Sequence, residues 1–265
     1  MDAQNVDGQL VPSKLQRHVL DTYLTLRIGI AVLAFAFPFL LLLVGKLAGL
    51  ENQGSMSAYY WAEVKRDGWL SSPQGRVLFV GLLCAIAAFL YLYKGFTKRE
   101  NVALNLAAFF AVCVAFFPME MNCTNTDQPE VAGQLYYCFP GLNPHGPSAA
   151  LLFACLAYVM WWRSDDTVRM IKDKTLRSRY RALYRMTSLA MVALPLVAGL
   201  FHVFRNNYST LTFWLEAGGV ISFSGYWFIK SFELKRTFAD AKAASGVGIP
   251  PLDHAPSPSP QLPAA

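Results

Sequence analysis

Four ionisable side chains at the edges of long apolar runs are the residues of this chain most able to do chemistry. They are Glu120 after the third run, His145 before the fourth, His202 near the end of the fifth and Glu216 near the start of the sixth. Charged groups are costly to bury in a membrane and usually mark functional sites there. The four therefore predict one polar cavity. The alternative is that they lie at headgroup depth, where water reduces the cost.

The same four side chains also suggest a metal site, because zinc accepts imidazole and carboxylate ligands. The chain has no local ligand pair of the H-x-x-x-H kind, and it has no serine-nucleophile, phosphate-loop or dinucleotide motif. We therefore expect no metal and no cofactor. The sequence leaves enzymatic activity open and favours a protein without one.

A polar and aromatic segment after the first apolar run adds three hydroxyl groups to the candidate site, those of Ser57, Tyr59 and Tyr60. Aromatic residues are enriched at membrane interfaces, so the first interpretation is an interfacial anchor. The alternative is a hydrogen-bonding lid over the polar cavity.

Two cysteines lie in the long loop between the third and fourth runs. Cys123 and Cys138 would close a loop of 16 residues, which is worth about 3 kcal/mol in the chain-entropy view of disulfides. The loop is expected on the extracytoplasmic face, where oxidising conditions favour disulfides, so we expect a disulfide between them. The alternatives are two free thiols and, less favoured because there is no C-x-x-C spacing, a redox-active pair.

Six apolar stretches must position these side chains. A helix needs roughly 20 apolar residues to cross the hydrocarbon core, and about 17 are enough. The chain is 54% hydrophobic and 15% charged, against roughly 25% charged residues in soluble domains. The sequence predicts an all-α, polytopic transmembrane bundle of six helices. The expected spans are residues 28–46, 77–94, 101–120, 146–162, 186–204 and 212–230.

The basic residues predict the orientation. With both ends in the cytoplasm, the inner regions hold 3, 3, 8 and 4 Lys or Arg residues, which is 18 of the 23 in the chain. Cytoplasmic loops collect Lys and Arg. This split favours cytoplasmic N- and C-termini. It also accounts for the basic pI without nucleic acid as a partner.

Two regions flank the predicted transmembrane domain of residues 28–231. Residues 1–27 read as a cytoplasmic amphipathic segment, and residues 232–265 as a cytoplasmic tail that is proline-rich and disordered from about residue 245. Between the fourth and fifth runs, basic and apolar residues alternate at helical spacing. The cations there predict contact with anionic lipid headgroups; they are Arg177, Arg179, Arg181 and Arg185.

Strips of small residues predict where helices approach closely. One strip lies in each of three runs: Gly81, Ala85 and Ala88 in the second; Ala103, Ala107, Ala111 and Ala115 in the third; Gly218, Ser222 and Gly225 in the sixth.

Three motifs resemble those of an uncharacterised family of six-helix bacterial inner-membrane proteins. They are S-A-Y-Y at residues 57–60, F-V-G-x-L at 79–83, and F-W-x-E at 213–216 followed by Trp227 and Lys230. The resemblance covers about residues 25–235. It implies the same fold and a bacterial inner membrane, and it implies no activity. Relatives often carry Asp just before the F-V-G motif, where this chain has Val77 and Leu78.

A weaker similarity, in architecture alone, is to membrane hydrolases related to alkaline ceramidases. Those enzymes use a zinc site of three histidines with Ser and Asp. Here only His145 and His202 are predicted near the membrane, so the resemblance implies an incomplete ligand set.

Two functions follow as expectations. The first is non-enzymatic binding, transport or scaffolding of a lipid or small amphiphile at an outward-facing polar cavity. The second is metal-assisted hydrolysis of a lipid.

Overall fold

The computed structural model describes residues 14–47, 52–60, 74–95, 97–119, 144–169, 171, 173–205 and 210–237. All regular secondary structure in these residues is helical, which confirms the predicted class. Four of the described helices contain segments long and apolar enough to cross a membrane: Arg17–Leu47, Gln74–Leu92, Lys98–Phe116 and Lys174–Phe201. The described part of the chain is therefore helical, and the length and composition of these helices are those of a membrane protein.

The first three helices form one side of the bundle. α1 (Lys14–Leu47), α2 (Gln74–Leu92) and α3 (Lys98–Phe116) alternate in direction, and α2 packs against both α1 and α3. The turn between α2 and α3 ends in a helix cap, because the Thr97 hydroxyl accepts a hydrogen bond from the Glu100 amide at 3.2 Å. A short 3-10 turn, η1 (Ser57–Tyr60), lies between α1 and α2 in the sequence.

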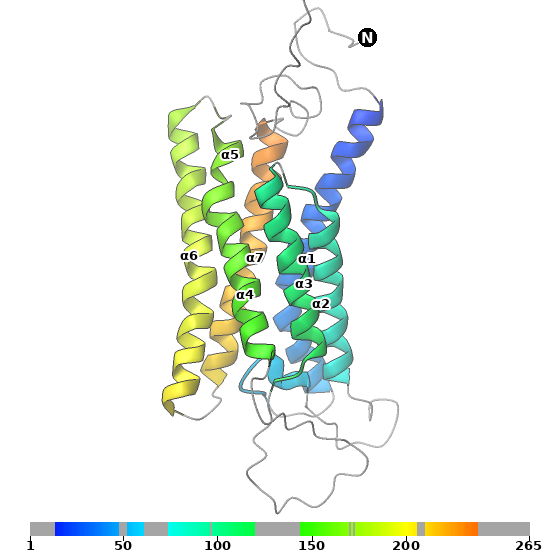
Figure 1. Cartoon of the computed structure of the whole chain (residues 1–265), viewed down its shortest axis with the longest axis vertical. Helices are drawn as coiled ribbons and strands as arrows, with labels where there is room; N and C mark the ends of the chain where they lie inside the picture. The colour runs from blue at the N-terminus through cyan, green and yellow to red at the C-terminus, as the bar shows by residue number, and fades with distance from the viewer. Residues whose placement is uncertain are drawn as a thin grey trace, which may run out of the picture.

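The second half begins with α4 (His145–Tyr158), which continues into a π-helical turn, η3 (Val159–Arg163), and a short α5 (Asp165–Val168). α6 (Lys174–Arg205) and α7 (Thr210–Thr237) follow. α7 contacts both α6 and α1 and so joins the two halves (Figure 1).

The two ends of the bundle differ in charge. α1, α3 and α6 begin and α7 finishes at one end, whereas η1 lies at the other (Figure 1). We call the first the basic end, because Lys14, Lys98, Lys174 and Arg177 lie in the opening turns of those helices, and the second the η1 end.

α1 and α6 are longer than the apolar runs inside them. α1 begins within the predicted N-terminal segment and continues unbroken into the first span. α6 begins within the predicted basic loop, where the Asp173 carboxylate accepts hydrogen bonds from the amides of Thr175 and Leu176 at 2.8 and 3.3 Å. No helix-breaking residue separates the amphipathic and apolar parts, so each pair forms one helix.

The small-residue strips are only partly buried against other helices. The four alanines of α3 are buried. In α7, a Cβ on Gly219 would lie 2.5 Å from a Pro195 ring carbon, and a Cβ on Gly218 would lie 2.8 Å from Leu194, so α6 approaches closely there. The prediction that the strip in α2 packs closely against another helix is wrong at Gly81, since a Cβ there would meet nothing within 4 Å.

Candidate functional site

Glu216 is hydrogen-bonded to a segment distant in the sequence. Its carboxylate accepts hydrogen bonds from the Ser55 hydroxyl, at 3.0 and 2.9 Å to the two oxygens, and from the Met56 amide at 2.8 Å. Ser55 and Met56 are buried. A buried charge is tolerated when it is hydrogen-bonded, and these three contacts supply that compensation. The donors are neutral groups.

The same segment reaches His145 through Ser57. The Nδ1 atom of His145 lies 2.7 Å from the Phe117 carbonyl, which can only accept, so Nδ1 carries the proton. In the neutral ring Nε2 is then an acceptor, and the Ser57 hydroxyl donates to it at 3.0 Å. His145 precedes the apolar run 146–162, and burial lowers its pKa, which favours the neutral ring.

Local hydrogen bonds shape the segment that carries these contacts. Ser55 accepts the Ala58 amide on its carbonyl at 3.2 Å and the Ser57 amide on its hydroxyl at 3.2 Å. The Ser55 hydroxyl therefore accepts from Ser57 while it donates to Glu216. This turn aims the hydroxyls of residues 55 and 57 at two different helices, α7 and α4.

Tyr59 fixes the segment to the bundle. Its side chain is 1% exposed and its ring centroid lies 5.9 Å from that of Phe213. A Cβ on Gly45 would lie 2.8 Å from the Tyr59 ring, and one on Gly75 would lie 2.6 Å from the Tyr59 carbonyl. Both glycines are needed for this close approach. Burial raises the pKa of the Tyr59 hydroxyl, so it stays protonated.

Tyr60 faces α2. Its ring meets Phe79 edge-on at 6.4 Å, and the Arg76 guanidinium lies 4.8 Å from its centroid. The Nε–H of Arg76 also donates to the Tyr60 carbonyl at 3.1 Å. Helices α1, α2, α4 and α7 therefore all contact residues 55–60.

Of the predicted site residues, the structure brings together Ser57, Tyr59, His145 and Glu216 around one segment, with Tyr60 beside it. Glu120, Cys123 and Cys138 lie outside the described residues. His202 lies in α6, but its side chain is not described. Sequence reasoning missed Ser55 as a partner of Glu216, because the two are 161 positions apart.

The predicted basic residues of α6 lie at the opposite, basic end. Arg177 donates to the Ile171 carbonyl, with its Nε at 3.0 Å, and Arg185 lies 5.8 Å from the centroid of the Trp161 ring. Arg179 is exposed and Arg181 is partly exposed.

A second polar group, near the basic end, was not predicted. Lys230 and Glu233 of α7 are 2% and 0% exposed and lie 3.4 Å apart. The Tyr184 hydroxyl of α6 donates to the Glu233 carboxylate, and the Lys230 ammonium donates to the Thr167 hydroxyl of α5. We call these four residues the Lys230 cluster. In the sequence, Lys230 stands at the end of the last expected span and Glu233 in the expected cytoplasmic tail, and the burial of the two together was not predicted.

Among the described side chains, no three His, Cys, Asp or Glu residues are grouped so that they could hold a metal ion. Comparison of the chain with protein families, with curated proteins and with solved structures found no significant match. The resemblance to six-helix inner-membrane proteins therefore rests on the motifs alone.

Proposed function

We propose that this chain is a six-helix protein of the bacterial inner membrane that binds a lipid or small amphiphile at its η1 end and catalyses no reaction. The observation that carries the proposal is the set of hydrogen bonds from Ser55 and Met56 to Glu216. Both donors are neutral groups, so these contacts place no cation beside the carboxylate, and a headgroup that donates hydrogen bonds can take their place.

The proposed orientation places both chain ends in the cytoplasm and the η1 end outside. Lys and Arg residues of α1, α3 and α6 gather at the basic end, in agreement with the distribution of positive charge in membrane proteins. α4 and α7 are the two proposed spans beyond the four apolar ones. α7 packs against both α1 and α6, and two of its charged residues, Lys230 and Glu233, are buried in the bundle.

The contacts suggest the chemistry of the ligand. Glu216 now receives hydrogen bonds from a hydroxyl and an amide, so a ligand that replaces them needs O–H or N–H groups in its headgroup. Both present donors belong to residues 55 and 56, which lie outside the long helices. A headgroup can therefore replace them without separating two helices.

The test compares two lipids with the same acyl chains. We expect native mass spectrometry of the purified full chain to show tighter binding of phosphatidylethanolamine, whose ammonium donates hydrogen bonds, than of phosphatidylcholine, whose headgroup does not. Glu216→Gln removes the charge and should abolish this preference. Asp21→Asn, a change of the same kind at an exposed position of α1, should retain it. Equal binding of the two lipids by the unmodified protein contradicts the proposal.

Elemental analysis of the same preparation addresses the alternative. A metal-assisted lipid hydrolase would carry about one zinc ion per chain, whereas the proposed binding protein carries none. Stoichiometric zinc, together with lipid hydrolysis that a chelator stops, would replace our proposal with the alternative.

A further inference from the structure

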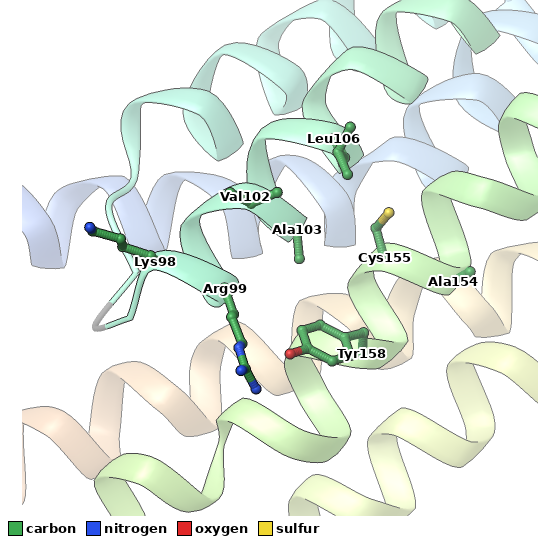
Figure 2. A pocket seen from close by; sticks show the side chains of 8 residues that line it. All are labelled: Lys98, Arg99, Val102, Ala103, Leu106, Ala154, Cys155 and Tyr158. Carbon is green, nitrogen blue, oxygen red and sulfur yellow. The ribbon is translucent and has the colours of Figure 1, made fainter. Parts of the chain in front are cut away.

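An open groove of about 480 Å³ lies between α3 and α4 near the basic end (Figure 2). Its apolar part is formed by Val102 and Leu106 of α3 and by Ala154 and Cys155 of α4. Val102 and Leu106 are 55% and 45% exposed. In a helix bundle surrounded by lipid, such a surface contacts acyl chains rather than water.

Small side chains create the groove. α3 and α4 pack against each other along their length, and alanine at 103 and 154 leaves the space that a larger side chain would fill. The space is on the outside of the bundle and is open along one side, so a chain-like molecule can enter it laterally from the bilayer.

The polar end of the groove is positively charged. Lys98 and Arg99 stand in the first turn of α3, and Figure 2 shows Arg99 beside the hydroxyl of Tyr158. The start of a helix adds partial positive charge at the same place. Arg163, which donates to the Thr97 hydroxyl at 2.9 Å, brings a third cation close to this turn.

Glu100, the acidic residue in the first turn of α3, does not line the groove. Glu100 is 3% exposed, and its side chain packs against Gly95, on the turn between α2 and α3. The groove therefore presents cations at one end and a continuous apolar surface at the other, which is the pattern of an anionic lipid.

We propose that this groove binds one anionic glycerophospholipid from the surrounding bilayer. Its phosphate lies at Arg99 beside the Tyr158 hydroxyl, with Lys98 adding positive charge in the same turn of α3, and one acyl chain lies along Val102, Leu106 and Cys155. A soluble phosphate would leave the apolar surface uncovered, and a choline headgroup would bring a cation to the two cations of α3. The site is separate from Glu216 and does not depend on the function proposed for the η1 end.

The test is a lipid titration of the purified full chain in neutral detergent, followed by native mass spectrometry. We expect one phosphatidylglycerol to bind at least about fivefold more tightly than phosphatidylcholine with the same acyl chains. In the double variant Lys98→Gln and Arg99→Gln this preference is lost. Inorganic phosphate in excess leaves lipid binding unchanged, because the acyl chain contributes to it; full displacement by phosphate would show a site for a free anion and contradict the proposal.

Two further variants separate the groove from general surface charge. Lys174→Gln with Arg179→Gln removes one Lys and one Arg from exposed positions of α6 at the same end, and it should retain the single tight phosphatidylglycerol. Ala154→Phe fills the groove without changing the charge, so this variant should no longer bind the tight phosphatidylglycerol. Val102→Phe is the second variant if Ala154→Phe does not fold. The proposal is overturned if the α6 variant loses phosphatidylglycerol binding as fully as the Lys98→Gln and Arg99→Gln variant does. It is also overturned if a folded groove-filling variant still binds this lipid tightly.

Discussion

At the start of α7 the Glu216 carboxylate is held by neutral donors from residues 55 and 56, whereas near its end the Glu233 carboxylate lies beside the Lys230 ammonium. The partners of Glu216 come from a turn outside the long helices. Glu233 contacts Lys230 of α7 itself and Tyr184 of the adjacent α6, so these contacts lie within the long helices.

The difference separates a candidate ligand site from a structural one. At the basic end the Glu233 carboxylate and the Lys230 ammonium are buried together, so removal of either group breaks a buried ion pair, which is strongly destabilising. At the η1 end the charge of Glu216 is solvated by dipoles that a ligand can replace. Substitutions in the Lys230 cluster should therefore change stability most, and substitutions around Glu216 should change binding most.

The largest expected effect is that of Lys230→Met, which removes the ammonium that lies 3.4 Å from the buried Glu233 carboxylate. We expect the free energy of unfolding of the detergent-solubilised protein to fall by about 3–5 kcal/mol. Lys235→Met, at an exposed position of the same helix, should change it by less than about 0.5 kcal/mol. If the two substitutions cost the same, the ion pair does not stabilise the bundle and the comparison fails.

A smaller loss is expected for Gly75→Ala, because the added Cβ would lie 2.6 Å from the Tyr59 carbonyl. The segment must move, at a cost of about 1–3 kcal/mol in thermal or chemical unfolding, and the binding preference for phosphatidylethanolamine should weaken with it. Gly81→Ala in the same helix meets nothing within 4 Å and should be neutral or stabilising by up to about 1 kcal/mol. An unfolding cost for Gly81→Ala as large as that for Gly75→Ala would show that the close approach of Tyr59 is not the cause.

The smallest effect is that of Ser57→Ala, which removes the hydroxyl that donates to His145. We expect a loss of about 1 kcal/mol, measured by unfolding, because the imidazole nitrogen loses its donor. Ser178→Ala, at an exposed position of α6, is the matched control and should have no effect. If Ser57→Ala lowers the free energy of unfolding as much as Lys230→Met is expected to, the η1 end contributes as much to stability as the basic end and the comparison fails.

The sequence predicted the helical class, and apolar runs predicted segments of α1, α2, α3 and α6 that are long enough to cross a membrane. It could not show that α1 and α6 extend through the flanking amphipathic stretches. Only the lipid-facing part of each helix is apolar on all sides, so the apolar run ends before the helix does. The sequence also could not tell the strip of small residues in α7, where a Cβ on Gly218 would meet Leu194, from the strip at Gly81, since the i, i+4, i+7 spacing is the same in both.

For the candidate site, the positions of the ionisable residues at the edges of the apolar runs predicted that His145 and Glu216 lie at the same end of the bundle. The partner of Glu216 was missed because Ser55 is one of two serines in a short segment, and only the folded turn decides which one faces α7. Lys230 and Glu233 follow the last apolar run, where charges normally meet water. Burial by α5 and α6 is a tertiary effect that local spacing does not encode.

The most direct test of the account is the sidedness of the η1 end, because an outward-facing polar site is its central claim. The five native cysteines are replaced, and single cysteines are introduced at Asn52 and at Ser178, both exposed in the structure and at opposite ends of the bundle. A thiol reagent that does not cross the inner membrane, applied to intact cells with a permeable outer membrane, should label Asn52→Cys and spare Ser178→Cys until the inner membrane is broken. Labelling of Ser178→Cys alone in intact cells would reverse the orientation and place the Glu216 site in the cytoplasm.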